Sequence, residues 1–127
     1  MILKDSITHF NTSQIPLGQS FIVLCFSPYC PYCRAEIDDI IKNINKFKST
    51  KVYLITSFPI SDMILFYEDY HLSKYKNILI AQDYKNAFLQ YYNIKGIPYT
   101  AVYNEQKKLK SALLGKSDAT EIKEIIQ

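Results

Sequence analysis

The segment Cys-Pro-Tyr-Cys at residues 30–33 contains the side chains best suited to chemistry, two thiols separated by two residues. A cysteine attacks a disulfide as its thiolate, and a second thiol about one helical turn away can displace the mixed disulfide that results. In this arrangement Cys30 is the nucleophile and Cys33 is the resolving thiol. The Pro-Tyr dipeptide between them adds no formal charge, and Arg34, the nearest cation, is expected to point to solvent.

The same two cysteines could instead form half of a zinc site, which requires two further cysteine or histidine ligands. Only Cys25, His9 and His71 remain for that role. Cys25 lies in an apolar run, where a free cysteine behaves as a small hydrophobic core residue, and we expect both histidines on the surface without a chemical role. We therefore expect no metal. An inert Cys-x-x-Cys is the other alternative, and the elements around the pair argue against it.

A buried strand followed by a helix positions the two cysteines. Residues 21–26 are continuously apolar, as in a strand that is covered on both faces. Pro31 suits the first position of a helix, where its missing N–H costs nothing, and apolar residues recur at helical spacing through residue 47. Cys30 therefore lies at a helix N-terminus, where unpaired backbone N–H groups and the helix dipole favour negative charge.

The rest of the chain continues this alternation of strands and helices. No repeat or linker interrupts it, so we expect a single domain over residues 1–127. The order β-α-β-α-β-α-β-β-α indicates an α/β fold, a sheet with helices on both faces. Ile7 and Phe10 are expected core contacts. The predicted elements after residue 50 are strands at 52–55 and 78–81, helices opened by Ser61-Asp62 and by Asp83, a hairpin of 99–103 and 109–114, and a helix capped by Ser117-Asp118.

Composition excludes several classes of protein. The 127 residues are 48% hydrophobic, 14% aromatic and 21% charged, which is typical of a globular chain. No apolar run approaches the roughly 20 residues of a transmembrane helix. The net charge of +3 is modest and the lysines are dispersed, so we expect no nucleic-acid partner. We expect a monomer.

The N-terminal residues carry no charged-then-apolar leader pattern. If Met1 is the native start, the pattern predicts a cytoplasmic protein.

Two separated segments resemble the thioredoxin superfamily. The first is residues 21–36, which contain the Cys-x-x-Cys, and the second is residues 92–100, which resemble the family's loop before a cis-proline. The resemblance covers about residues 15–127 and implies a thioredoxin-like fold, with a central mixed β-sheet flanked by helices on both faces. The interval between Cys33 and Pro98 is longer than in thioredoxins and glutaredoxins. It therefore implies an extra strand-helix unit, as in the TlpA/ResA-like branch. If a leader or anchor has been removed, this resemblance implies a periplasmic or extracytoplasmic location.

The resemblance also implies a substrate groove around the two cysteines. Pro98 would face the Cys-x-x-Cys as the family's cis-proline, since X-Pro bonds alone adopt the cis form at modest cost. Ile97 would offer backbone hydrogen bonds to an extended substrate. Tyr29, Pro31 and Tyr32 complete the implied substrate-binding surface, with Tyr29 where thioredoxins usually have tryptophan.

Residues 30–36 match the C-x-x-C-x-x-E pattern of the TlpA/ResA-like branch. Glu36 lies one helical turn after Cys33, so it could exchange a proton with the resolving thiol. The alternative for Glu36 is a solvated carboxylate in the first turns of the helix. Leu24 occupies the position of the buried aspartate of thioredoxins, so proton transfer by that route is absent.

These features predict a thiol–disulfide oxidoreductase that uses the Cys30–Cys33 couple to reduce, rather than to oxidise or isomerise, protein disulfides. Its partners would be protein thiols and disulfides and an upstream electron donor, and no cofactor is needed. One alternative is a glutathione-dependent reductase, because Cys-Pro-Tyr-Cys is a glutaredoxin motif. Another is a non-catalytic binding module that keeps the fold. A peroxidase would need the P-x-x-x-T-x-x-C pattern of peroxiredoxins, which residues 28–33 do not supply.

Overall fold

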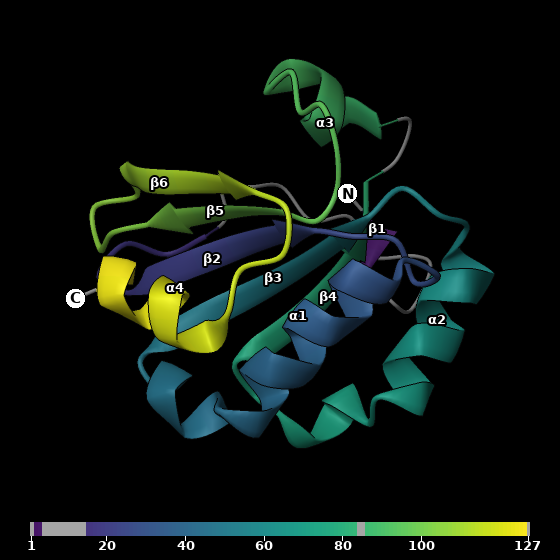
Figure 1. Ribbon diagram of the computed structural model, residues 1–127, viewed down its shortest axis with the longest axis horizontal. Coiled ribbons are helices and arrows are strands. Elements are labelled where there is room, and N and C mark those ends of the chain that lie inside the picture. The colour runs from purple at the N-terminus through teal and green to yellow at the C-terminus, as the bar shows by residue number, and fades with distance from the viewer. Residues whose placement is uncertain (1, 4–14, 84–85, 127) are drawn as a thin grey trace.

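A computed structural model describes residues 2–3, 15–83 and 86–126 of the chain. The expectations for Ile7, His9 and Phe10 lie outside these residues. Figure 1 shows the arrangement of the elements. The strands are β1 (Ile2–Leu3), β2 (Ser20–Cys25), β3 (Thr50–Thr56), β4 (Ile78–Gln82), β5 (Tyr99–Tyr103) and β6 (Leu109–Leu114); the α-helices are α1 (Pro31–Lys42), α2 (Ile60–Asp69), α3 (Ala87–Tyr91) and α4 (Ala119–Ile126); the 3-10 helices are η2 (Ile44–Phe47) and η3 (Leu72–Lys74).

The strands form one mixed sheet in the order β1-β4-β3-β2-β5-β6. Strands β2, β3 and β4 are parallel, whereas β5 pairs antiparallel with both β2 and β6. This confirms the predicted strands and the hairpin. Strand β1, which pairs antiparallel with β4, was not predicted, because two residues carry no periodicity of their own. Between α1 and Pro98 lie β3, α2, β4 and α3, the two strands and two helices that the long interval predicted.

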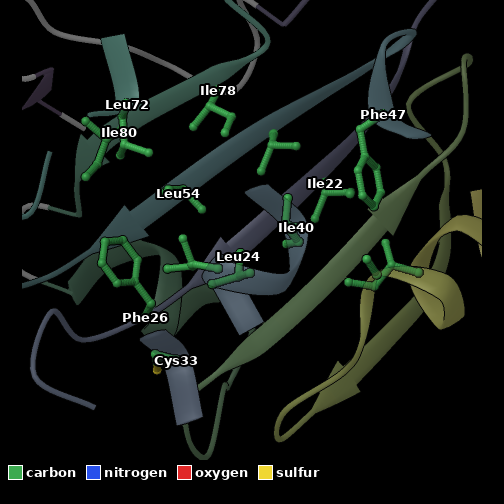
Figure 2. Packing of buried hydrophobic residues seen from close by; sticks show 14 of the residues in the cluster. Ile22, Leu24, Phe26, Cys33, Ile40, Phe47, Leu54, Leu72, Ile78 and Ile80 are labelled. Carbon is green, nitrogen blue, oxygen red and sulfur yellow. The ribbon is translucent and has the colours of Figure 1, made fainter. Parts of the chain in front are cut away.

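Helices cover both faces of the sheet, as predicted. On one face α1, α2 and α4 pack against Ile22, Leu24, Val52 and Leu54, side chains that alternate along β2 and β3. Figure 2 shows Cys33 among the residues of this cluster, at its end near Phe26. The intervening residues of β2 and β3 point to the opposite face, where α3 contributes Phe88 to a smaller cluster; its members from the strands include Phe21, Val23, Cys25, Tyr53 and Ile55.

Two predicted helix starts need correction. Helix α2 begins at Ile60 directly after Pro59, and no side chain caps it, so Ser61-Asp62 lies inside its first turn. Asp83 is not the first residue of a helix, since α3 begins only at Ala87. Its carboxylate still bonds to the first turn of this helix, because it accepts the backbone N–H of Phe88 at 2.9 Å. The cap of the last helix is confirmed: Asp118 Oδ1 accepts the N–H of Glu121 at 2.8 Å.

Candidate active site

The two cysteines lie at the start of α1, where β2 has just ended. Cys30 is the N-cap residue, with φ −85° and ψ 119°, and Pro31 follows within the first turn. The Sγ atom of Cys30 accepts the backbone N–H of Cys33 at 3.3 Å, so one of the helix's unpaired donors is directed at this sulfur. All three cysteines are free thiols. The sequence-based placement of Cys30 and Pro31 is thus confirmed.

The two sulfurs differ in their access to solvent. Cys30 is half-buried, whereas Cys33 has 0% of its surface exposed. Burial, followed by the hydrogen bond with Cys30, raises the pKa of Cys33 to about 12. Cys30 is therefore accessible from solvent, and Cys33 is a thiol at neutral pH.

Glu36 is buried against the start of α4, with 0% of its surface exposed. Its Oε2 atom accepts the hydroxyl of Thr100 at 2.5 Å, and its Oε1 atom accepts the backbone N–H of Ser117 at 2.9 Å. The alternative of a solvated carboxylate is therefore wrong. Burial raises the pKa of Glu36 above its ordinary value, and the two hydrogen bonds oppose that shift.

The loop before β5 lies beside the end of β2, because Tyr99 pairs with Cys25. The Ile97–Pro98 peptide bond is cis, as predicted, and the carbonyl of Pro98 accepts the N–H of Gly115 at 2.8 Å. Pro98 itself is buried, whereas Ile97 is 40% exposed. A cavity of about 270 Å³ opens beside this loop; its lining includes Phe26, Ile55, Phe58, Leu89 and Ile97.

Exposed aromatic residues lie on either side of Cys30 in the sequence. Tyr29 is 61% exposed and Tyr32 is 68% exposed, and Pro31 between the cysteines is also exposed. The hydroxyl of Tyr29 donates to Asp62 of α2, and its ring lies 5.6 Å from that of Phe58. Neither contact was predicted, because Asp62 and Phe58 belong to the next strand-helix unit of the chain.

The expectation that Arg34 points to solvent is wrong. Its Nη1 atom donates to the carbonyl of Pro28 at 2.6 Å, and its guanidinium lies 5.1 Å from the ring centroid of Tyr70 and 5.6 Å from that of Phe66. The planar guanidinium can stack on rings and donate at its edge at once, which an ammonium cannot do. Arg34 therefore joins α1 to α2 and holds the segment that leads to Cys30.

Cys25 lies on the opposite face of the sheet from Cys33 and is 2% exposed, as expected for a core residue. Burial raises its pKa to about 12. His71 is exposed, as predicted. In the described part of the chain, no group of three or more histidine, cysteine, aspartate or glutamate side chains is arranged to hold a metal ion.

Cys25 is accordingly expected to resist alkylation in the folded protein, because a buried thiol supplies little thiolate and little access. Brief treatment of the reduced protein with iodoacetamide should modify Cys30 and leave Cys25 unmodified until denaturant is added, as read by peptide mass spectrometry. Modification of Cys25 at a rate comparable to Cys30 would contradict this placement.

Solved structures with the same fold have low sequence identity to this chain. A secreted disulfide oxidoreductase of Mycobacterium tuberculosis, homologous to DsbE of E. coli, matches with a TM-score of 0.80 and 16% identity over 98% of this chain and 90% of its own. StoA of Bacillus subtilis matches with a TM-score of 0.69 and 20% identity over 98% and 94%. The exposed lipoprotein thioredoxin Etrx1 of Streptococcus pneumoniae matches with a TM-score of 0.73 and 18% identity over 98% and 96%. The fold is therefore thioredoxin-like.

The family follows from the sequence itself. The model of the AhpC/TSA family matches residues 2–112, and the chain belongs to that family. A search of curated proteins found no match. Among the described residues, no helix is both long and apolar enough to cross a membrane.

Proposed function

We propose that this protein catalyses thiol–disulfide exchange with protein substrates through Cys30 and Cys33. The observation that carries the proposal is the pairing of an accessible thiol at a helix N-cap with a buried thiol one turn further on. In a Cys-x-x-Cys that occurred by chance, we would not expect one sulfur to be accessible to solvent and the other to be buried in the core. The thioredoxin-like fold and the membership of the AhpC/TSA family support the same chemistry.

The reaction proceeds in two exchanges. The Cys30 thiolate attacks one sulfur of the substrate disulfide, forms a mixed disulfide and releases the other sulfur as a thiolate, which takes up a proton. Cys33 then loses its proton, attacks the Cys30 sulfur and releases the second substrate thiolate. The protein gains the Cys30–Cys33 disulfide and the substrate gains two thiols, so the two electrons lost by the protein equal those gained by the substrate.

Glu36 is the proposed acceptor of the Cys33 proton. It follows Cys33 by one helical turn, and its negative charge is the smallest of the causes that raise the pKa of Cys33. A carboxylate whose own pKa is raised by burial holds a proton more readily than an exposed one. A transfer to Glu36 would keep the Cys33 proton within the protein during the resolving step.

We propose further that the protein acts as a reductant. Strong oxidants of this fold stabilise their reduced form by favouring the thiolate of the accessible cysteine. The cation closest in sequence, Arg34, is engaged by the Pro28 carbonyl and by two aromatic rings. An upstream donor of electrons must then return the oxidised protein to the dithiol.

The proposal is tested by the reduction of insulin, a protein disulfide substrate, with dithiothreitol as the electron source. The wild-type protein should accelerate insulin reduction, and a Cys30→Ala/Cys33→Ala variant should leave the uncatalysed rate unchanged. Equal rates for the two proteins would overturn the proposal. If the double variant still retained the partners that bind wild-type protein, the binding-module alternative would replace it; turnover with glutathione as the only reductant would favour the glutaredoxin-like alternative.

A further inference from the structure

The two oxygens of Glu36 have partners of different kinds. Oε1 accepts a backbone N–H, that of Ser117, and a backbone N–H can only donate. Oε2 accepts the hydroxyl of Thr100, and a hydroxyl can either donate or accept. Thr100 is 0% exposed and Ser117 is 5% exposed, so water does not readily replace either partner. The two oxygens are therefore unequal as places for a proton.

We propose that Thr100 is a positioning residue for proton transfer from Cys33, because its hydroxyl donates to Oε2 when Glu36 is ionised and accepts from Oε2 when Glu36 is protonated. The proton received from Cys33 then resides on Oε2, and Oε1 keeps its bond to Ser117 in both states. This inference rests on the proposed function, and it adds a role for Thr100 that the Cys-x-x-Cys chemistry does not itself require.

The bond to Ser117 is part of the attachment of α4 to α1. Asp39, one turn after Glu36, accepts the backbone N–H of Ala119 through Oδ2 at 2.6 Å. The two carboxylates of α1 thus hold the N–H of Ser117, just before α4, and that of Ala119, the first residue of α4, which has no partner within the helix. A proton on Oε1 would break one of these two bonds. A proton on Oε2 preserves both, which is why the adaptable partner is needed at Oε2.

The other charges that act on Glu36 come from the segment before α4 and from α4 itself. Lys116 favours the ionised carboxylate, and Glu121 opposes it. Both side chains are exposed, so solvent screens their effect. The α1 helix contributes the thiol of Cys33, and the sheet contributes Thr100 with its cross-strand neighbour Leu24, neither of which titrates. Besides the fixed N–H donor of Ser117, the Thr100 hydroxyl is therefore the group that acts most directly on the Glu36 carboxyl.

The transfer of the proton from Cys33 to Glu36 neither creates nor consumes protons and involves no oxidation or reduction. The proton leaves Cys33 Sγ and binds Glu36 Oε2, and the Cys33 thiolate then attacks Cys30 in the mixed disulfide. The substrate sulfur leaves with the bonding electron pair and takes up a proton from water, and Glu36 releases its proton to water. Glu36 and Thr100 thereby return to their starting states.

The test is a titration of the Glu36 carboxyl carbon by NMR in protein labelled with ¹³C-glutamate. The Glu36 signal is assigned as the one that Glu36→Gln lacks. The variants are Thr100→Val, which removes the hydroxyl at nearly constant shape, and Thr100→Ser, which keeps it. Thr56→Val is the matched control, because Thr56 is another buried threonine (1% exposed) whose hydroxyl bonds elsewhere, to the N–H of Phe58.

Thr100→Val should raise the midpoint of the Glu36 titration by about one pH unit, because the ionised carboxylate loses a donor. Release of thiol from a preformed Cys30 mixed disulfide should then be about tenfold slower at pH 7, with its pH profile displaced to higher pH. Thr100→Ser should restore both midpoints, and Thr56→Val should leave the Glu36 midpoint unchanged.

An unchanged Glu36 midpoint in Thr100→Val would overturn the inference, and so would an equal displacement in Thr100→Ser or Thr56→Val. If Thr100→Val does not fold, Thr100→Ser is compared with the wild type instead. A Glu36 midpoint displaced by as much as one pH unit, although the hydroxyl is retained, would overturn the inference. An unchanged Glu36 midpoint would support it. The carboxyl titration needs no turnover. A protein that failed to reduce insulin but showed the expected titration would therefore contradict the proposed function and not the pairing of Thr100 with Glu36.

Discussion

Replacement of Cys33 by serine is expected to trap the protein in a mixed disulfide with its substrate. Cys30 can still attack, but no thiol remains one turn away to resolve the adduct. Replacement of Cys30 by serine should give no adduct and should lower the rate of disulfide reduction by on the order of 10³-fold or more, because the nucleophile is lost. Both outcomes are read by mass spectrometry under non-reducing conditions after incubation with oxidised substrate.

Cys25→Ala is the matched control for these two variants. Cys25 lies on the other face of the sheet and has no part in the exchange, so Cys25→Ala should form and resolve mixed disulfides at the wild-type rate. Stable adducts on Cys30→Ser, or a loss of activity in Cys25→Ala without loss of folding, would show that the wrong thiols have been assigned.

Replacement of Glu36 should separate its role in catalysis from its role in folding. Glu36→Gln keeps an acceptor for Ser117 and a group that can bond Thr100, so the fold should persist. Without a carboxylate, however, the resolving step at neutral pH should slow by about 10²-fold. Glu36→Ala leaves the N–H of Ser117 buried without a partner, and should lower the free energy of unfolding by about 1–3 kcal/mol.

The pH dependence of stability gives a further check on Glu36. Its pKa is raised in the folded state, so the folded protein binds this proton more tightly than the unfolded chain does. The free energy of unfolding of the wild type, measured relative to Glu36→Gln, should therefore be highest in acid. It should fall as the pH rises from the unfolded value of 4.5 through the higher folded pKa. Urea unfolding of both proteins at pH 4 and pH 8 measures this, and a constant difference would contradict the burial of the carboxylate.

Local patterns were sufficient to predict the elements that carry the cysteines. The apolar run of β2 and the proline after Cys30 placed the nucleophile at a helix N-terminus, and the structure confirms that position. The cis form of the Ile97–Pro98 bond followed from a resemblance in sequence and is also confirmed. Each of these features depends on residues that are close together in the chain.

The surroundings of Glu36 and Arg34 could not be predicted in the same way, because they depend on distant residues. Thr100 lies 64 residues from Glu36, and Ser117 lies 81 residues away. Helical periodicity places Glu36 on the same face as Cys33, but only the packing of β5 and α4 against α1 makes that face a closed interior. Arg34 likewise leaves solvent because Phe66 of α2 and Tyr70, directly after α2, present their rings to it.

The position of the buried acid illustrates the same limit. Leu24, on β2, is paired with Thr100 on β5, and Glu36 reaches this Thr100 from helix α1. The absence of an acid at Leu24 predicted that proton transfer from the strand is absent. A carboxylate nevertheless lies beside the same pair of strands, supplied by the helix, and only the three-dimensional arrangement shows that it bonds to Thr100.

The central claim is that Cys30 and Cys33 form a reversible redox couple, and a redox titration tests it most directly. The protein is equilibrated with mixtures of oxidised and reduced dithiothreitol or glutathione, its thiols are alkylated, and the masses are measured. We predict a two-electron transition between a Cys30–Cys33 disulfide and two thiols, with Cys25 reduced throughout and a potential near the reducing end of the roughly −270 to −120 mV that such proteins span. If no disulfide forms under any condition, the account is contradicted.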